Sequence, residues 1–232
     1  GVVEHGIATT VYSWTGDDLW ADEFRRHGVR ILSIGGPKRI HSPLDVFRFA
    51  LAWIRLVRQF RRDGVQILHT HDFLPSLIGR TAAIAARVPG RITTLHNLYD
   101  WWPKWVHLAN RVLAHKTQSI TCVSESVRTF MIERSGLPAS KLVTILNGVD
   151  ENRFRSNSEA RARIRTELGI EDADILVGNV GSITTRKAHW ILVKAIAPLI
   201  REGFRIQVRV WGTNTKNPQH AEAELLSMID SE

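Results

Sequence analysis

Apolar and polar positions follow two alternating patterns along the chain. Short apolar runs, typical of buried parallel strands, alternate with longer stretches in which apolar residues recur at helical spacing. The pattern repeats about every 25 to 30 residues, as in strand–helix–strand units built around a parallel sheet. We therefore predict a doubly wound α/β fold.

The first part of the chain fits a series of strands and helices. The strands are predicted at residues 7–14, 29–34, 65–70, 91–96, 118–123 and 142–146. The helices are predicted at residues 17–27, 44–62, 74–87, 102–115 and 125–135. Pro43 and Gly64 bracket the second helix, where proline and glycine best start and stop one. Small residues in the third helix predict a close approach to the sheet: Gly79, Ala82, Ala83, Ala85 and Ala86.

A change of composition marks a second domain. Residues 150–174 are polar and charged, which predicts a linker and a surface helix, and we place the boundary between domains 1–155 and 156–232. In the second domain we predict strands at 175–180 and 205–211 and helices at 187–201 and 218–228. Two strands cannot bury both faces of a parallel sheet, so about 100 further residues are expected to follow.

The composition favours a reducing compartment and anionic partners. Cys122 is the only cysteine, which excludes an internal disulfide and a cysteine-based metal cluster. The formal net charge of +8 favours phosphorylated ligands, nucleic acid or an acidic membrane face. The basic residues are scattered and no recognition module accompanies them, so no nucleic-acid role is expected. Without a long apolar run or a signal-peptide pattern, a cytoplasmic location is expected.

The helix at 44–62 permits two interpretations. It carries Leu44, Phe47, Leu51, Ile54 and Val57 at helical spacing among several arginines. A basic amphipathic helix of this kind can lie on an anionic membrane, on the inner face if the protein is cytoplasmic. The alternative, which a doubly wound sheet favours, is that the apolar face covers the sheet. The aromatic group Trp101, Trp102 and Trp105 also permits two interpretations. It could contact a membrane interface or an acceptor, or it could pack its own helix against the protein.

The loop after the strand at 175–180 has the chemistry of a phosphate site. Ligands of open α/β sheets bind beyond the carboxyl ends of the strands, where helix N-termini and loop amides converge. Gly181 and Ser182 begin this loop, and Arg186 and Lys187 end it ahead of an apolar helix. Such a loop suits a diphosphate. The alternative is an ordinary loop whose two cations are solvated.

Three histidines end two neighbouring strands. His69 and His71 lie two positions apart, so both imidazoles point to one face of their strand. A metal site there needs a third ligand, and hydrogen-bonded structural histidines are favoured. His96 ends the next strand. A histidine side chain, whose ordinary pKa lies near neutral pH, can orient or deprotonate a substrate hydroxyl there. Taken alone, a structural or capping role for His96 is the more common one.

Two further strand ends carry small or polar residues. Ser124 and Glu125 follow the strand at 118–123, and Ser124 is a good N-cap for the helix that begins there. Asn147 and Gly148 follow the strand at 142–146, ahead of Asp150. Both residue types tolerate the positive φ of a tight turn, so a reversal of the chain is predicted.

Taken in order, these segments resemble the retaining GT-B glycosyltransferases of family 4, over nearly the whole chain. The segments are QILHTH at 66–71, TTLH at 93–96, VSES at 123–126, ILNGVD at 145–150 with Phe154, and GNVG at 178–181 before Lys187. The resemblance implies two Rossmann-like domains that face each other across a cleft. It also implies transfer of a sugar from a nucleotide-diphosphate sugar to an acceptor hydroxyl, on a glycan or a lipid-linked saccharide, with retention of anomeric configuration.

The same resemblance implies roles for individual residues. Lys187, with Arg186, Gly181 and Ser182, would hold the donor phosphates in the second domain. His96 would be the cleft histidine on the acceptor side. Cleft or hinge positions would be Asn147, Gly148, Asp150, Ser124 and Glu125. No cofactor and no obligatory metal are implied.

The chain departs from the family pattern at several points. Ser182 stands where the family usually has arginine, with Arg186 the candidate to supply the charge, and Ala188 stands where it usually has glycine. The family's first strand and its paired glutamates are expected outside this sequence, so the fragment alone is expected to be inactive. A catalytically inactive GT-B binding module is therefore the alternative. A dinucleotide-dependent oxidoreductase is disfavoured, because no Gly-x-Gly-x-x-Gly follows any strand.

Overall fold

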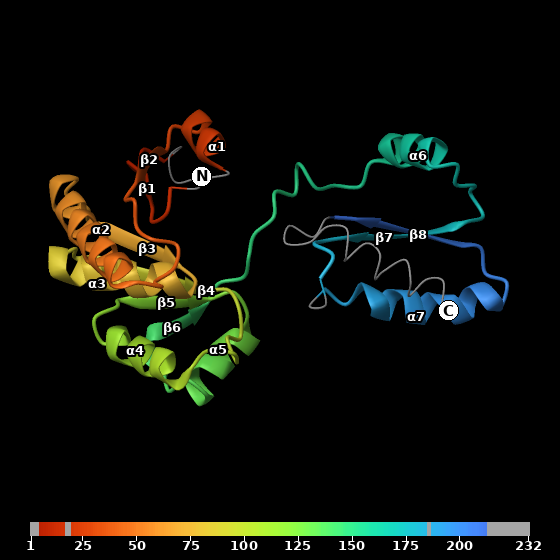
Figure 1. Ribbon diagram of the computed structural model, residues 1–232. Helices are drawn as coiled ribbons and strands as arrows, with labels where there is room; N and C mark the ends of the chain where they lie inside the picture. Colours follow the sequence, from red (N-terminus) through yellow and green to blue (C-terminus); the bar gives the residue numbers. More distant parts are fainter. Residues whose placement is uncertain (1–4, 17–19, 185–186, 213–232) are drawn as a thin grey trace. The chain divides into compact units, whose positions relative to one another are not determined.

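The chain folds into two compact units, Gly1–Gly148 and Val149–Glu232 (Figure 1). The computed structural model describes residues 5–16, 20–184 and 187–212. The division between the units falls close to the boundary placed near residue 155. The helix predicted at 218–228 and the prediction for Arg186 lie outside the described residues.

All the strands predicted in the first part of the chain are present, and their pairings are parallel. β1 and β2 pair with each other, and the other four form one sheet in sequence order. The strands are β1 (Thr10–Ser13), β2 (Arg30–Ser33), β3 (Ile67–His71), β4 (Gly90–Leu95), β5 (Ser119–Cys122) and β6 (Leu142–Thr144). Helices follow the strands as predicted: α1 (Ala21–Arg26), α2 (Pro43–Arg62), α3 (Phe73–Ala86), α4 (Lys104–Ala114) and α5 (Glu125–Glu133), with a 3-10 turn at Ala139–Lys141.

The ends of α2 are fixed by local sequence. The Ser42 side chain accepts a hydrogen bond from the Asp45 amide, and Asp45 accepts one from the Ser42 amide, which is a capping box. Pro43 occupies the first turn, where its missing N–H costs nothing. Gly64 follows the helix with φ 58°, a conformation that glycine adopts freely. The predicted start and stop are confirmed.

The helix α3 lies very close to β3, as its small residues predict. A Cβ added to Gly79 would lie 2.8 Å from Cγ2 of Thr70, and Ala82 and Ala83 are fully buried. Thr70 and Leu68 therefore face α3. Because side chains alternate along a strand, His69 and His71 lie on the opposite face of the sheet.

The predicted apolar face of α2 needs correction. Of the stripe named above, only Val57 is buried, and Leu44, Phe47, Leu51 and Ile54 are 37–59% exposed. The buried face consists instead of Ala52, Leu56, Val57 and Phe60, which join residues of β3 and α3 in one core cluster. The helix is apolar on two sides, and its contact with α3 decides which side is covered. A second cluster lies between β5, α4 and α5.

The second unit has a strand pair with helices on both sides. α6 (Ser158–Glu167) precedes β7 (Ile175–Val180), and α7 (His189–Arg201) precedes β8 (Ile206–Trp211). β7 and β8 pair in parallel, and α6 and α7 lie on opposite sides of the pair (Figure 1). The polar segment predicted to hold a linker and a surface helix contains α6. Among the described residues of both units, no helix is long and apolar enough to cross a membrane.

Ala188 gives a test of the strain at the start of α7. It is the N-cap residue of α7 with φ 51° and ψ 39°, a left-handed conformation that a Cβ disfavours. We expect Ala188→Gly to raise the free energy of unfolding by about 1 kcal/mol, measured by urea denaturation. Gly169 provides the reverse control, since it has φ 65° and open space around an added Cβ. Gly169→Ala should lower stability by a similar amount, and a loss of stability in Ala188→Gly would contradict the prediction.

Candidate functional site

The carboxyl ends of β3 to β6 lie at one edge of a parallel sheet, which is where ligands of this fold class bind. His71 ends β3 and His96 directly follows β4. Ser124 and Glu125 follow β5, and Ile145 follows β6. The structure therefore brings His71, His96, Ser124 and Glu125 to one edge.

The three histidines form a row on the open face of this sheet. His71 Nδ1 lies 3.0 Å from His96 Nε2, within hydrogen-bonding distance. The rings of His69 and His71 are 4.4 Å apart between centroids, and those of His71 and His96 are 5.3 Å apart. His69 Nε2 lies 2.7 Å from the hydroxyl of Thr94, which in turn contacts that of Thr121. The row is thus continued by a chain of hydroxyl groups.

The surroundings keep two of these imidazoles uncharged. Partial desolvation lowers the pKa of His69, with a smaller contribution from His96. Desolvation also lowers the pKa of His71, helped by His69 and His96 and opposed by Asp72. Near neutral pH both rings are therefore neutral. Within the described residues, no group of three or more His, Cys, Asp or Glu side chains could hold a metal ion.

One residue at this edge, Tyr99, was not singled out from the sequence. The Tyr99 hydroxyl donates a hydrogen bond to Asp72 Oδ1 and accepts one, at 3.0 Å, from the backbone N–H of His96. Tyr99 is 2% exposed and stacks on Trp102. Because Tyr99 lies in an irregular loop, no periodic pattern in the sequence identifies it. Its position three residues after His96 is the signal that was available.

Ser124 and Glu125 tie α5 to the sheet edge. The Ser124 hydroxyl accepts a hydrogen bond from the Val127 amide at 3.2 Å, so its predicted capping role is confirmed. Glu125 accepts hydrogen bonds from the Thr144 hydroxyl at 2.6 Å and from Arg128 at 2.8 Å. These bonds, the one from Thr144 first, lower the pKa of Glu125. The carboxylate is therefore ionised and remains an acceptor.

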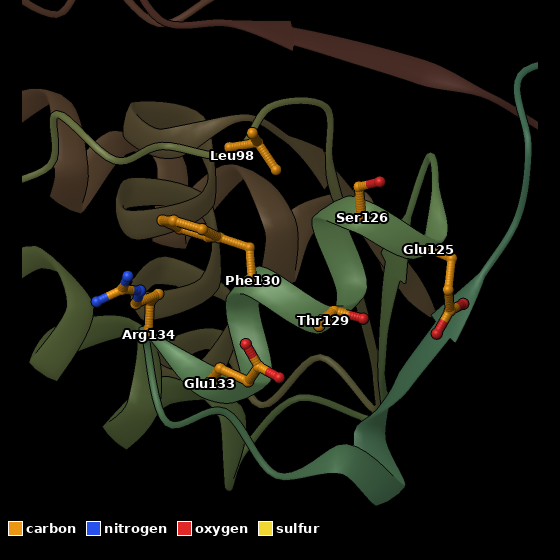
Figure 2. A pocket seen from close by; sticks show the side chains of 7 residues that line it. All are labelled: Leu98, Glu125, Ser126, Thr129, Phe130, Glu133 and Arg134. Atoms are coloured by element: carbon orange, nitrogen blue, oxygen red, sulfur yellow. The ribbon is translucent and has the colours of Figure 1, made fainter.

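A shallow pocket of about 460 Å³ runs along the exposed side of α5 (Figure 2). Its lining combines carboxylates, hydroxyls, one arginine and two apolar side chains: Leu98, Glu125, Ser126, Thr129, Phe130, Glu133 and Arg134. In Figure 2, Glu125 lies at the right of the view and Arg134 at the left, and Phe130 and Leu98 lie between them. The pocket can offer hydrogen-bond acceptors and an aromatic face to a polar ligand.

The segment after β6 differs from its prediction. Neither Asn147 nor Gly148 has positive φ, and residues 145–150 form an irregular stretch instead of a tight turn. These residue types tolerate positive φ without requiring it, so the predicted chain reversal is wrong. Asp150 instead organises the turn that follows, since its Oδ1 accepts hydrogen bonds from the Asn152 and Arg153 amides.

In the second unit, Gly181, Ser182 and Lys187 lie together in the loop between β7 and α7. The aliphatic carbons of Lys187 would lie 3.8–3.9 Å from a Cβ added to Gly181, so the lysine side chain passes over this glycine. The Lys187 amide donates to the Thr184 carbonyl at 2.9 Å. The ammonium group therefore belongs to a loop at the N-terminus of a helix, where backbone amides and the helix dipole favour an anion.

His189 is a second residue that the sequence did not reveal. It is 4% exposed, and its Nε2 lies 3.1 Å from the Ser182 carbonyl, to which it must donate. Gly212 approaches the same loop so closely that an added Cβ would lie 1.8 Å from the Gly181 carbonyl oxygen. The loop is thus held from the first turn of α7 and from the end of β8.

The lowered pKa values of His69 and His71 predict an acid-sensitive fold. Below about pH 6.5, the ordinary pKa of histidine, the unfolded chain binds protons that the folded chain does not. We therefore expect the free energy of unfolding to fall as the pH drops below this value. The double variant His69→Gln/His71→Asn, which keeps amide donors near both positions, should flatten this part of the profile in urea denaturation. An unchanged slope in the double variant would refute the assignment.

Comparison with known proteins places this geometry in a family. Residues 1–153 match Glycosyltransferase Family 4. The putative glycosyltransferase EpsF of Bacillus subtilis is 27% identical over 78% of this chain and 49% of its own length. A phosphatidylinositol N-acetylglucosaminyltransferase subunit from Arabidopsis thaliana is 26% identical over 86% of this chain and 44% of its own. The chain thus spans about half the length of the curated relatives it matches.

Solved structures share the fold. A glycosyltransferase from Rickettsia africae superposes with a TM-score of 0.80 at 16% identity, covering 99% of this chain and 58% of its own. HepE from Anabaena, in complex with UDP-glucose, superposes with a TM-score of 0.75 at 18% identity, covering 96% of this chain and 57% of its own. The predicted α/β fold of the GT-B type is confirmed. Since the family match covers well over half of the sequence, the chain belongs to glycosyltransferase family 4.

Proposed function

We propose that the protein transfers a sugar from a nucleotide-diphosphate sugar to an acceptor hydroxyl, with retention of anomeric configuration. The observation that carries this proposal is the loop of Gly181, Ser182 and Lys187 at the N-terminus of α7. HepE, which shares the fold, is described in complex with UDP and with UDP-glucose, and this supports a nucleotide-sugar donor. Retention follows the family resemblance.

The chemistry of the donor loop suits a leaving diphosphate. Negative charge grows on the diphosphate as the bond to the sugar breaks, and fixed positive groups lower that barrier. Lys187 supplies a full charge, and the amides at the start of α7 supply partial charges. Ser182 supplies a hydroxyl where the family usually has an arginine, and Arg186 is proposed to replace that charge. No metal is required in this scheme.

The first unit is proposed to bind the acceptor, a glycan or a lipid-linked saccharide. His96 would contact the reacting hydroxyl, and Glu125 would contribute a carboxylate at the same sheet edge. The pocket along α5 supports a saccharide, because its carboxylates and hydroxyls match sugar hydroxyls and Phe130 provides an apolar face. Asn147, Gly148 and Asp150 lie in the segment that leads to the second unit, where a hinge role is proposed.

Replacement of Lys187 tests the donor site. In the full-length protein, Lys187→Ala should weaken UDP binding about tenfold or more in isothermal titration, since one charge-assisted contact is lost. Lys194→Ala is the matched control, because Lys194 is an exposed lysine of α7, outside the loop, and its Nζ lies over the Trp190 ring. Equal binding by the wild type and Lys187→Ala would refute the donor site. Binding of UDP without any transfer would favour the inactive binding module instead.

A peripheral position on the inner face of the membrane is also proposed for this protein. The exposed side of α2 presents Leu44, Phe47, Leu51 and Ile54 to solvent. Arg48, Arg55 and Arg58 lie on the same helix. Trp101 and Trp105 are also exposed, at 60% and 57%, whereas Trp102 is buried. Apolar and cationic groups on one helix are the combination that binds an anionic lipid surface.

Liposome co-sedimentation tests this position. The full-length protein should sediment at low salt with vesicles of phosphatidylcholine and phosphatidylglycerol, and much less with phosphatidylcholine alone. Phe47→Ser/Leu51→Ser should abolish the binding, while Ile164→Ser on α6 removes an exposed apolar residue elsewhere and should not. Binding that survives the double substitution would show that α2 is not the contact.

A further inference from the structure

Two residues beside His96 adopt backbone conformations that are rare outside glycine. Asp72, between β3 and α3, has φ 59° and ψ −169°, a region occupied almost only by glycine. Tyr99 has φ 55°. Residues in such conformations persist where surrounding contacts fix them, and they concentrate at functional sites. The strained backbone at both residues must therefore be held by contacts with other parts of the structure.

The Asp72 side chain does not serve the helix that it precedes. An aspartate at the N-cap position normally accepts a hydrogen bond from an amide of the first turn. No such bond forms at α3. Oδ1 of Asp72 accepts a hydrogen bond from the Tyr99 hydroxyl instead, and that hydroxyl accepts one from the His96 amide. The Asp72 carboxylate thus bonds to Tyr99, which in turn bonds to the His96 amide, and does not cap α3.

Tyr99 anchors this contact in the core. Its ring stacks on Trp102 at a centroid distance of 4.0 Å, and its side chain is almost fully buried. Burial, followed by the hydrogen bond to Asp72, raises the pKa of Tyr99 to about 12. The hydroxyl therefore keeps its proton and remains a donor at any physiological pH.

The contact also joins the two chain segments that carry His71 and His96. Asp72 directly follows His71, so the link from Asp72 through Tyr99 to the His96 amide joins the backbones at the ends of β3 and β4. Across this link the two rings meet through His71 Nδ1 and His96 Nε2. With Nε2 engaged, the ring nitrogen that His96 has left for another group is Nδ1.

We propose that Asp72 and Tyr99 form a positioning clamp that holds His96 against His71, so that His96 offers Nδ1 to the acceptor hydroxyl. This inference rests on the proposed function, because it assigns the clamp to the sugar-transfer step. Asp72, Tyr99 and His71 are positioning residues that act through His96. His96 is the catalytic residue of the four.

The two tyrosines of the chain provide a matched pair of variants. Tyr12 also donates a hydrogen bond to an aspartate, Asp63 of the α2 C-cap, at 2.7 Å and away from the histidines. Tyr99→Phe keeps the ring stacked on Trp102 and removes only the hydroxyl. In the full-length protein we expect kcat to fall about 10- to 100-fold with an unchanged KM for the donor, because a misplaced catalytic group lowers the rate by this order. Tyr12→Phe should leave kcat unchanged.

Variants of Asp72 separate the clamp from backbone strain. Asp72→Gly relieves the strained conformation and deletes the carboxylate, so thermal stability should be kept or raised while kcat falls. Asp72→Asn retains an oxygen acceptor for the Tyr99 hydroxyl, so its kcat should stay close to that of the wild type and above that of Asp72→Gly. The imidazole ¹⁵N resonances of His96, assigned by comparison with His96→Gln, should move in Tyr99→Phe and Asp72→Gly and stay in place in Tyr12→Phe.

The clamp is overturned if Tyr99→Phe and Asp72→Gly keep kcat within about twofold of wild type and leave the His96 resonances unmoved. Failure of the proposed function has a different signature. There, Lys187→Ala binds UDP as well as wild type, or neither binds it. A clamp that fails while Lys187→Ala still loses UDP leaves the donor site intact and removes only the role of Asp72 and Tyr99.

Discussion

The close contact between α3 and β3 is the constraint on which the rest of the first unit depends. Gly79 leaves no room for a Cβ beside Thr70, so α3 packs tightly on the face of β3 that carries Thr70 and Leu68. Alternation along β3 then places His69 and His71 on the other face. The chain must turn sharply from β3 into α3 to keep this contact. Asp72 occupies that turn in a glycine-like conformation, which brings its carboxylate to Tyr99.

The strands could be predicted from the sequence because buried parallel strands are continuous apolar runs, and their spacing follows from the helices between them. Helix ends were equally clear where the signals are local, as at Pro43 and Ser124. The face of α2 was not predictable. This helix is apolar on two sides, and only its tertiary contacts decide that Phe60 is buried and Phe47 exposed. The prediction of a turn at Asn147 was wrong for another reason, because a residue that tolerates positive φ need not adopt it.

The candidate site divides in the same way. His96, Glu125 and Lys187 could be named because they follow strands, and the carboxyl ends of parallel strands share an edge. Tyr99 and His189 were missed because their roles depend on partners that no spacing rule connects to them. Tyr99, in the loop after β4, contacts Asp72 at the end of the neighbouring strand β3, and His189 contacts the Ser182 carbonyl seven residues earlier. Residues that hold a site together are therefore harder to predict than residues that line it.

The two units handle charge in opposite ways, which agrees with the two halves of the sugar transfer proposed above. The loop before α7 combines a lysine with the positive end of a helix, which suits an anionic leaving group. In the histidine row, burial and then the neighbouring imidazoles lower the pKa of His69 and His71, so these two rings remain uncharged near neutral pH. An uncharged imidazole can accept a proton or orient a hydroxyl, whereas an imidazolium can only donate. Burial, helped by the neighbouring imidazoles, thus keeps His71 in the neutral form, in which its Nδ1 can either donate a hydrogen bond to His96 Nε2 or accept one from it.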